Sequence, residues 1–144
     1  MVNVEYEEVK KWLKQSRDLN KEINELILAK QEAFEIATGG AIDYSKDRIQ
    51  SGGSNGTEQR FIRYAEYEII INKRIDKLVE IKKEIFDLIQ NIDDSKCRTL
   101  LISYYINCKT LEQTADEMDY DVRWIHALHK KAIKKVQEIL NSSL

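Results

Sequence analysis

The sequence predicts an all-α protein, in which a long antiparallel helical hairpin precedes a three-helix module containing a helix-turn-helix. Its 144 residues include no proline, and all five glycines fall between Gly39 and Gly56. Residues 1–38 and 57–144 therefore lack both helix breakers. Apolar residues recur along both stretches at spacings of three and four, the period of an amphipathic helix. An all-β fold would need turn residues every ~8–12 positions, which this chain does not have.

A first helix is predicted over about residues 4–37. Its repeating face consists of Val9, Leu13, Ser16, Asn20, Ile23, Ile27, Lys30, Phe34 and Ala37. Because three of these residues are polar, the face is an imperfect heptad seam. Thr38-Gly39-Gly40 should end the helix, since glycine readily adopts the left-handed conformation found after a last helical turn.

A long loop is expected over residues 39–57, and its Gly/Ser/Asn part, residues 51–57, is expected to be mobile. Thr57 is the candidate N-cap of a second long helix, which runs from about Glu58 to Asn91. Two helices of similar length joined by a loop predict an antiparallel hairpin, and residues 1–92 form this first domain. A hairpin buries only one stripe of each helix. Further cover should come from a second copy or from the C-terminal helices.

Residues 93–144 form the second domain, with helices at about 94–107, 111–118 and 121–140. Thr110 and Gln113 have the spacing of a capping box. The expected core face of the last helix is Val122, Ile125, Leu128, Ala132, Ile133, Val136 and Leu140. Two short helices joined by a tight turn, the second of them basic and amphipathic, are typical of a helix-turn-helix.

The small side chain of Ala115 fits the place where the second helix of such a motif crosses the first. The turn Met118-Asp119-Tyr120-Asp121 must reverse the chain. Glycine is usual at its second position, so Asp119 is expected to adopt left-handed geometry. Asp121 is the expected N-cap of the following helix.

The net charge of −2 excludes a general polycation, so any contact with nucleic acid must come from a local patch. From Val122 onward the chain has five Lys or Arg residues and one acid, Glu138. The solvent face of the last helix is expected to present Arg123, His126, Ala127, Lys130, Lys131 and Lys134. Such a face suits base edges and phosphates.

The segment Leu100–Val136 resembles region 4 of sigma-70-type factors, the helix-turn-helix that reads the −35 promoter element. The nearer resemblance is to ArpU- and RinA-like late transcription regulators of phages and prophages, and to related uncharacterised proteins. It covers roughly residues 8–140 and includes the loop motif D-R-I-Q-S, here Asp47–Ser51. The resemblance implies a regulator that binds double-stranded DNA, acts with host RNA polymerase and works in the bacterial cytoplasm.

Positions that match the motif receive roles by this resemblance. Base contacts are assigned to Arg123, His126 and Lys130. Phosphate contacts are assigned to Lys109, Thr110, Lys131 and Lys134. Trp124 is expected to be half-buried scaffold packed against a neighbouring helix.

No catalytic, metal or cofactor site is expected. Cys97 and Cys108 lie eleven residues apart on one predicted helix, too far for a disulfide, and suit a reducing compartment. His126 and His129 have a spacing that occurs often by chance. Aliphatic runs are short, as at Ile69–Ile71, so no membrane span is expected.

Two other functions remain open. A protein-interaction adaptor would dock on RNA polymerase or a phage partner without strong DNA binding. A DNA-packaging protein of the small-terminase type also combines a helix-turn-helix with long helices. Homodimerisation through the long helices is compatible with the regulator, because a pair of modules doubles the DNA contacts.

Overall fold

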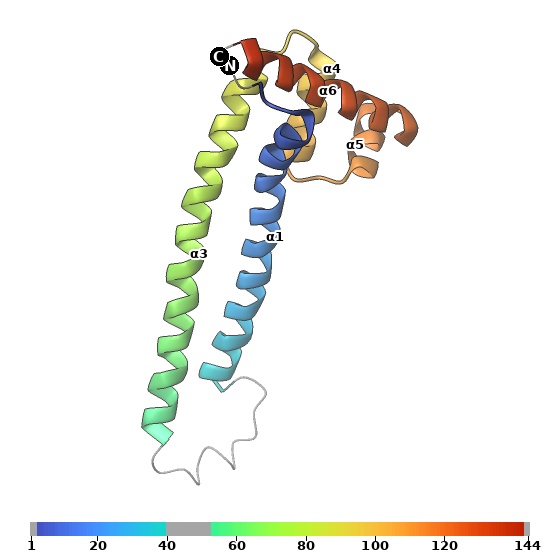
Figure 1. The fold of residues 1–144 in the computed structure, drawn as a ribbon. Coiled ribbons are helices and arrows are strands. Elements are labelled where there is room, and N and C mark those ends of the chain that lie inside the picture. Colours follow the sequence, from blue (N-terminus) through green and yellow to red (C-terminus); the bar gives the residue numbers. More distant parts are fainter. Residues whose placement is uncertain (1–2, 40–52, 143–144) are drawn as a thin grey trace. The chain divides into compact units, whose positions relative to one another are not determined.

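The computed structural model describes residues 3–39 and 53–142. All regular secondary structure in these two ranges is helical, which confirms the predicted all-α class (Figure 1). The elements are α1 (Tyr6–Ala37), α3 (Gly53–Ile89), α4 (Ser95–Leu101), the π-helical turn η1 (Ile102–Ile106), α5 (Leu111–Met118) and α6 (Val122–Ser142). No helix within the described ranges has an apolar stretch long enough to cross a bilayer.

Helix α1 ends where the sequence predicts. Gly39 adopts a φ of +83°, the left-handed conformation that glycine takes without steric cost. The Thr38 amide and hydroxyl both donate to the Phe34 carbonyl, at 2.9 and 2.8 Å. These bonds satisfy a carbonyl that the helix itself leaves without a partner.

Helix α3 begins at Gly53, five residues before the predicted start at Glu58. The expectation that residues 53–57 stay outside the helix is therefore wrong. Each interior glycine costs a helix about 1 kcal/mol, but extending an existing helix adds one hydrogen bond per residue. Thr57 consequently lies inside the helix and is not its N-cap. The rest of the expected loop, including the motif Asp47–Ser51, falls largely outside the described residues.

The chain divides into two compact units. We call Met1–Asn20 together with Leu78–Leu144 the helix-turn-helix unit, and Lys21–Lys77 the hairpin unit. Both long helices contribute to both units. This division differs from the boundary expected after residue 92, because the ends of α1 and α3 share the core of the C-terminal helices.

One buried core holds the helix-turn-helix unit together. Its fully buried side chains come from every helix of the unit and include Leu13, Ile85, Leu100, Tyr105, Ile125 and Ile133. Helices α4 and α5 both pack on α6 (Figure 1). Of the expected core face of α6, all but Val122 and Leu140 are buried, and these two are partly buried.

The hairpin unit is antiparallel, as predicted. Glu22 of α1 accepts a hydrogen bond from Arg74 of α3 at 2.8 Å, and Lys30 lies 3.4 Å from Glu68. Residue numbers therefore rise along α1 as they fall along α3, and the two helices run side by side (Figure 1). In this unit Ile23, Ala37 and Ile71 are the buried apolar side chains among the described residues. A two-helix layer has no second layer to cover its faces.

Candidate nucleic-acid interface

A complete capping box starts α5. The Gln113 amide donates to Thr110 Oγ1 at 3.1 Å, and the Thr110 amide donates to Gln113 Oε1 at 2.9 Å. The Thr110 side chain therefore fixes the first turn of α5 at the residue where the sequence predicts it. Thr110 is exposed at this end of α5, where the helix dipole favours an anion.

The turn between α5 and α6 has the geometry that the sequence predicts. Asp119 adopts φ 58° and ψ 42°, a left-handed conformation. The Tyr120 amide donates to the Ala115 carbonyl at 2.9 Å, which closes the end of α5. Asp121 Oδ1 accepts from the Arg123 amide at 3.1 Å and so caps α6. Ala115 is buried, as a residue at a close helix crossing must be.

Helix α6 is amphipathic, with its apolar face in the core and a cationic face in solvent. Arg123, His126, Lys130 and Lys134 are all exposed, together with Ala127. They recur every three or four residues, so they lie on one side of the helix. We call Arg123, His126, Lys130 and Lys134 the basic stripe. No ion pair of these four occurs among the described residues.

Two predicted phosphate contacts are already engaged with carboxylates. Lys109 Nζ lies 2.8 Å from Glu117 Oε2, and Lys131 Nζ lies 3.3 Å from Asp94 Oδ2. Burial would raise the pKa of Asp94, but hydrogen bonds from the Cys97 amide and from Lys131 outweigh it and lower the pKa. Asp94 thus stays ionised. Lys109 and Lys131 would have to leave these carboxylates to bind a phosphate.

Trp124 is only partly covered, by the turn before α6 and by a lysine of α4. It is 40% exposed, and its ring centroid lies 4.1 Å from that of Tyr120 in the preceding turn. Lys96 Nζ from α4 lies 5.5 and 5.4 Å from the two ring centroids. The pair stays near the surface because Trp124 follows Arg123 on the solvent side of α6.

The first helix of the module is not regular throughout. α4 changes after Leu101 into η1, where the Asn107 amide donates to the Ile102 carbonyl, five residues back. Cys108 then takes a φ of 54°, which lies outside a helix. The expectation that Cys108 shares a helix with Cys97 is therefore wrong. A π-helical turn widens the helix and leaves carbonyls that need other donors.

Two side chains of α1 supply these donors, and neither role is predicted from the sequence. Arg17 Nη1 donates to the carbonyls of Tyr104 and Lys109 at 2.8 and 2.7 Å. Ser16, fully buried, donates to the Tyr105 carbonyl at 2.8 Å. The signal available in the sequence was Ser16 itself, a polar residue within an apolar stripe.

A second buried contact supports α6 from beneath. The hydroxyl of Tyr105 and Nε2 of His129 lie 2.7 Å apart. Burial, helped by the nearby charge of Lys10, lowers the pKa of His129 to about 4. Burial also raises the pKa of the Tyr105 phenol, so both groups are neutral at pH 7. His129 is therefore scaffold, whereas His126, one turn away, faces solvent.

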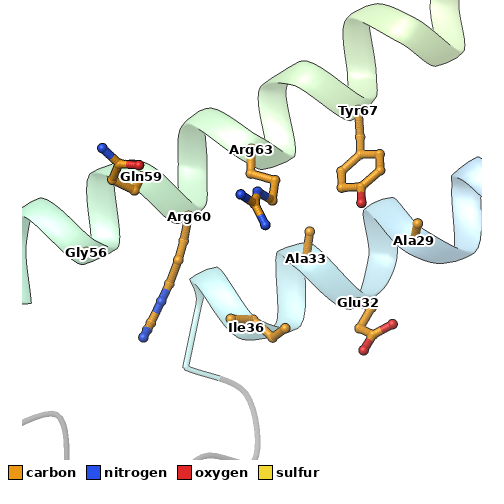
Figure 2. A pocket seen from close by; sticks show the side chains of 9 residues that line it. All are labelled: Ala29, Glu32, Ala33, Ile36, Gly56, Gln59, Arg60, Arg63 and Tyr67. Atoms are coloured by element: carbon orange, nitrogen blue, oxygen red, sulfur yellow. The ribbon is translucent and has the colours of Figure 1, made fainter.

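The cysteines and the acidic side chains are the remaining candidate groups. Both cysteines are free thiols, and burial raises the pKa of Cys97 to about 11. No cluster of three or more His, Cys, Asp or Glu side chains suited to a metal occurs in the described ranges. An open groove of about 510 Å³ lies in the hairpin unit, where Arg60, Arg63 and Tyr67 of α3 face the end of α1 (Figure 2).

The comparisons with known proteins identify a family but no activity. A family described as a protein of unknown function (DUF1492) matches residues 37–137. No curated protein and no solved structure matches the chain. The matched segment includes α5, the turn and most of α6, and it excludes Ser16 and Arg17. Because the match spans more than half of the chain, this protein belongs to the DUF1492 family.

Proposed function

We propose that this protein is a sequence-specific DNA-binding transcription regulator of the phage type, in which α6 enters the major groove of a duplex. The observation that supports it is the basic stripe. Four side chains that can contact DNA lie exposed on one side of α6. The opposite side of α6 is buried in the core, and the capped helix α5 and a left-handed turn precede α6. An exposed recognition helix braced in this way is the working part of a helix-turn-helix.

The position of each stripe residue along α6 suggests its role. Arg123 and His126 lie in the first turns of the helix, the part that meets base edges in this motif. An arginine can bond both acceptors of a guanine edge, which is worth ~1–3 kcal/mol of discrimination. Lys130 follows one turn later as a third base contact. Lys134 and Thr110 are assigned to phosphates, because a lysine and a helix N-terminus bind phosphate without reading sequence.

Lys109 and Lys131 contribute less than the other cations in this proposal. Each holds a carboxylate in the free protein, so a phosphate would replace an existing ion pair. With few free cations and a net charge of −2, one module binds DNA weakly. A second copy, or host RNA polymerase as the resemblance to sigma region 4 suggests, would raise the effective concentration at the promoter.

The test is a titration of duplex DNA selected from a random pool by the wild-type chain. Arg123→Ala should weaken binding to the selected duplex by about tenfold and leave binding to a scrambled duplex nearly unchanged. Lys134→Ala should weaken both duplexes alike. Lys73→Ala, which removes an exposed lysine in the hairpin unit, is the control and should change neither. Equal affinity of wild type and Arg123→Ala for the selected duplex would refute the assignment.

A protein-interaction adaptor is the second candidate, and one observation favours it. Trp124 is exposed, Tyr120 is partly buried, and beside Lys96 the two rings offer an aromatic contact surface of a kind enriched at protein interfaces. An adaptor would pass through a duplex-DNA column without salt-sensitive retention. Trp124→Ala would then abolish binding to RNA polymerase, while Arg123→Ala would not.

A further inference from the structure

The seam between the two helices of the hairpin unit is only half covered. Ile23 and Ile71 are buried, at 5% exposure each. The next apolar seam positions are open: Ile27 and Ile75 are 43% and 39% exposed. Phe34 is likewise 45% exposed. In a self-sufficient pair of helices these a and d positions would be the buried ones.

The exposed apolar residues lie on one side of the hairpin unit. At about 100° per residue, Ile27 and Phe34 lie a little further round α1 than buried Ile23. Ile75 and Phe61 lie further round α3 than buried Ile71, in the same sense. In an antiparallel pair this rotation turns both helices to the same side. Consistently, an open groove is lined by Ile27, Lys30, Gln31, Phe34 and Tyr64.

We call this surface the apolar side, and its large apolar side chains are Ile27, Phe34, Phe61 and Ile75. It is also poor in charge. By the same helical geometry, Glu68 is the one charged described residue that points there, and Lys30 pairs with it. The opposite side holds the groove with Arg60 and Arg63 (Figure 2). Depletion of charge around apolar residues distinguishes the core of an interface from ordinary surface.

We propose that the apolar side binds a second copy of this chain, so that two hairpin units form an antiparallel four-helix bundle. At roughly 200 Å² for a whole side chain of this size, exposures of 39–45% leave about 340 Å² on the four residues. A standard interface buries ~800 Å² of each partner, a little over half of it apolar. These four residues would therefore supply most of the apolar part of such an interface.

The Lys30–Glu68 pair favours a copy of the same chain over a foreign partner. Its two members lie at one level of the hairpin, 3.4 Å apart. If α1 packs on α3 of the second copy, with all neighbours antiparallel, Lys30 meets Glu68 of the second copy. A two-fold axis along the bundle makes both such contacts, and a polar pair inside an apolar seam fixes its register.

The test is the mass of the full chain by sedimentation equilibrium at micromolar concentrations. Wild type should sediment at twice the chain mass of 16.9 kDa. Ile75→Glu places a carboxylate in the seam and should weaken the dimer by about a hundredfold or more. Ile70→Glu is the matched control, since it changes an isoleucine of the same helix and the same 39% exposure on the opposite side. Its dimer should keep the wild-type affinity.

A charge exchange tests the register. Lys30→Glu should weaken the dimer by about tenfold or more, and Lys30→Glu with Glu68→Lys should restore it. A wild-type monomer would overturn the proposal and assign the surface to a foreign partner. A larger ring, or equal effects of Ile75→Glu and Ile70→Glu, would also overturn it. Because the readout is mass, this inference can fail while DNA binding through α6 stands, and the reverse.

Discussion

The guanidinium carbon of Arg17 lies 3.8 Å from the ring centroid of Tyr104, although 87 residues separate them in sequence. The same guanidinium donates to the carbonyls of Tyr104 and Lys109, on both sides of the point where η1 ends. One side chain of α1 thereby holds the segment that leads into α5. The orientation of the helix-turn-helix depends on this contact.

Arg17→Ala should lower the free energy of unfolding by about 3 kcal/mol, because two carbonyls lose a charged donor and Tyr104 loses a cation–π contact. Arg17→Lys should recover only part of the loss, since an ammonium lacks the planar fork that spans both carbonyls. Urea titrations followed by circular dichroism measure both values. Lys14→Ala, an exposed lysine of the same helix, should stay within about 0.5 kcal/mol of wild type. Equal stability of Arg17→Ala and Lys14→Ala would show that the contacts of Arg17 do not stabilise the fold.

Asp119→Ala should destabilise the helix-turn-helix by about 1 kcal/mol, because alanine pays the full steric cost of a left-handed residue. Asp119→Gly should be at least as stable as wild type, since glycine has no such cost. Thermal unfolding of the three proteins gives the order. Asp116→Ala removes a neighbouring carboxylate inside α5 and should not destabilise the protein. If Asp119→Ala matched Asp119→Gly, the turn would not need its observed φ.

Stability should fall in mild acid because of His129. Its pKa of about 4 in the folded protein lies below the ~6.5 of an unfolded histidine. Between these values the unfolded chain binds the proton more readily, so unfolding becomes easier as the pH falls. The contribution is complete above pH ~6.5 and lost at pH ~4. It amounts to about 2 kcal/mol, less than the full shift implies because part of the ring meets solvent.

Urea titrations of wild type and of a variant without His129, each at several pH values, separate this effect from that of the carboxylates. His129→Gln should flatten the pH dependence between pH ~6.5 and ~4, since glutamine cannot titrate. Lys134→Gln, at an exposed lysine of the same helix, should keep the wild-type profile because a lysine does not titrate in this range. A steeper or unchanged profile in His129→Gln would contradict the assignment.

The parts of the fold that depend on local pattern are predictable from sequence. The ends of α1 and α5, the left-handed Asp119 and the buried Ala115 follow from capping, turn chemistry and helical period. The early start of α3 at Gly53 does not, because propensity opposes it. The basic stripe is also a matter of period, since it lies opposite the apolar residues of α6.

The parts that depend on distant residues are not predictable in this way. The turn η1 requires donors from Ser16 and Arg17, which lie 87 or more residues away from their acceptors. The pair of Lys131 with Asp94 likewise joins residues on different helices. The spacing of residues along α6 does not distinguish Lys131 from Lys134, although Lys131 forms an ion pair with Asp94.

The salt dependence of duplex binding tests the account most directly. The logarithm of the wild-type affinity should fall linearly with the logarithm of salt concentration. Lys134→Ala should lower this slope by about 1, and Lys130→Ala, which removes a base contact, should lower it less. Lys131→Ala, which frees Asp94, should lower it less, and Lys73→Ala should leave it unchanged. Duplex binding that is absent at low salt, or whose slope is the same in all four variants, would contradict the proposal that α6 is a DNA-recognition helix.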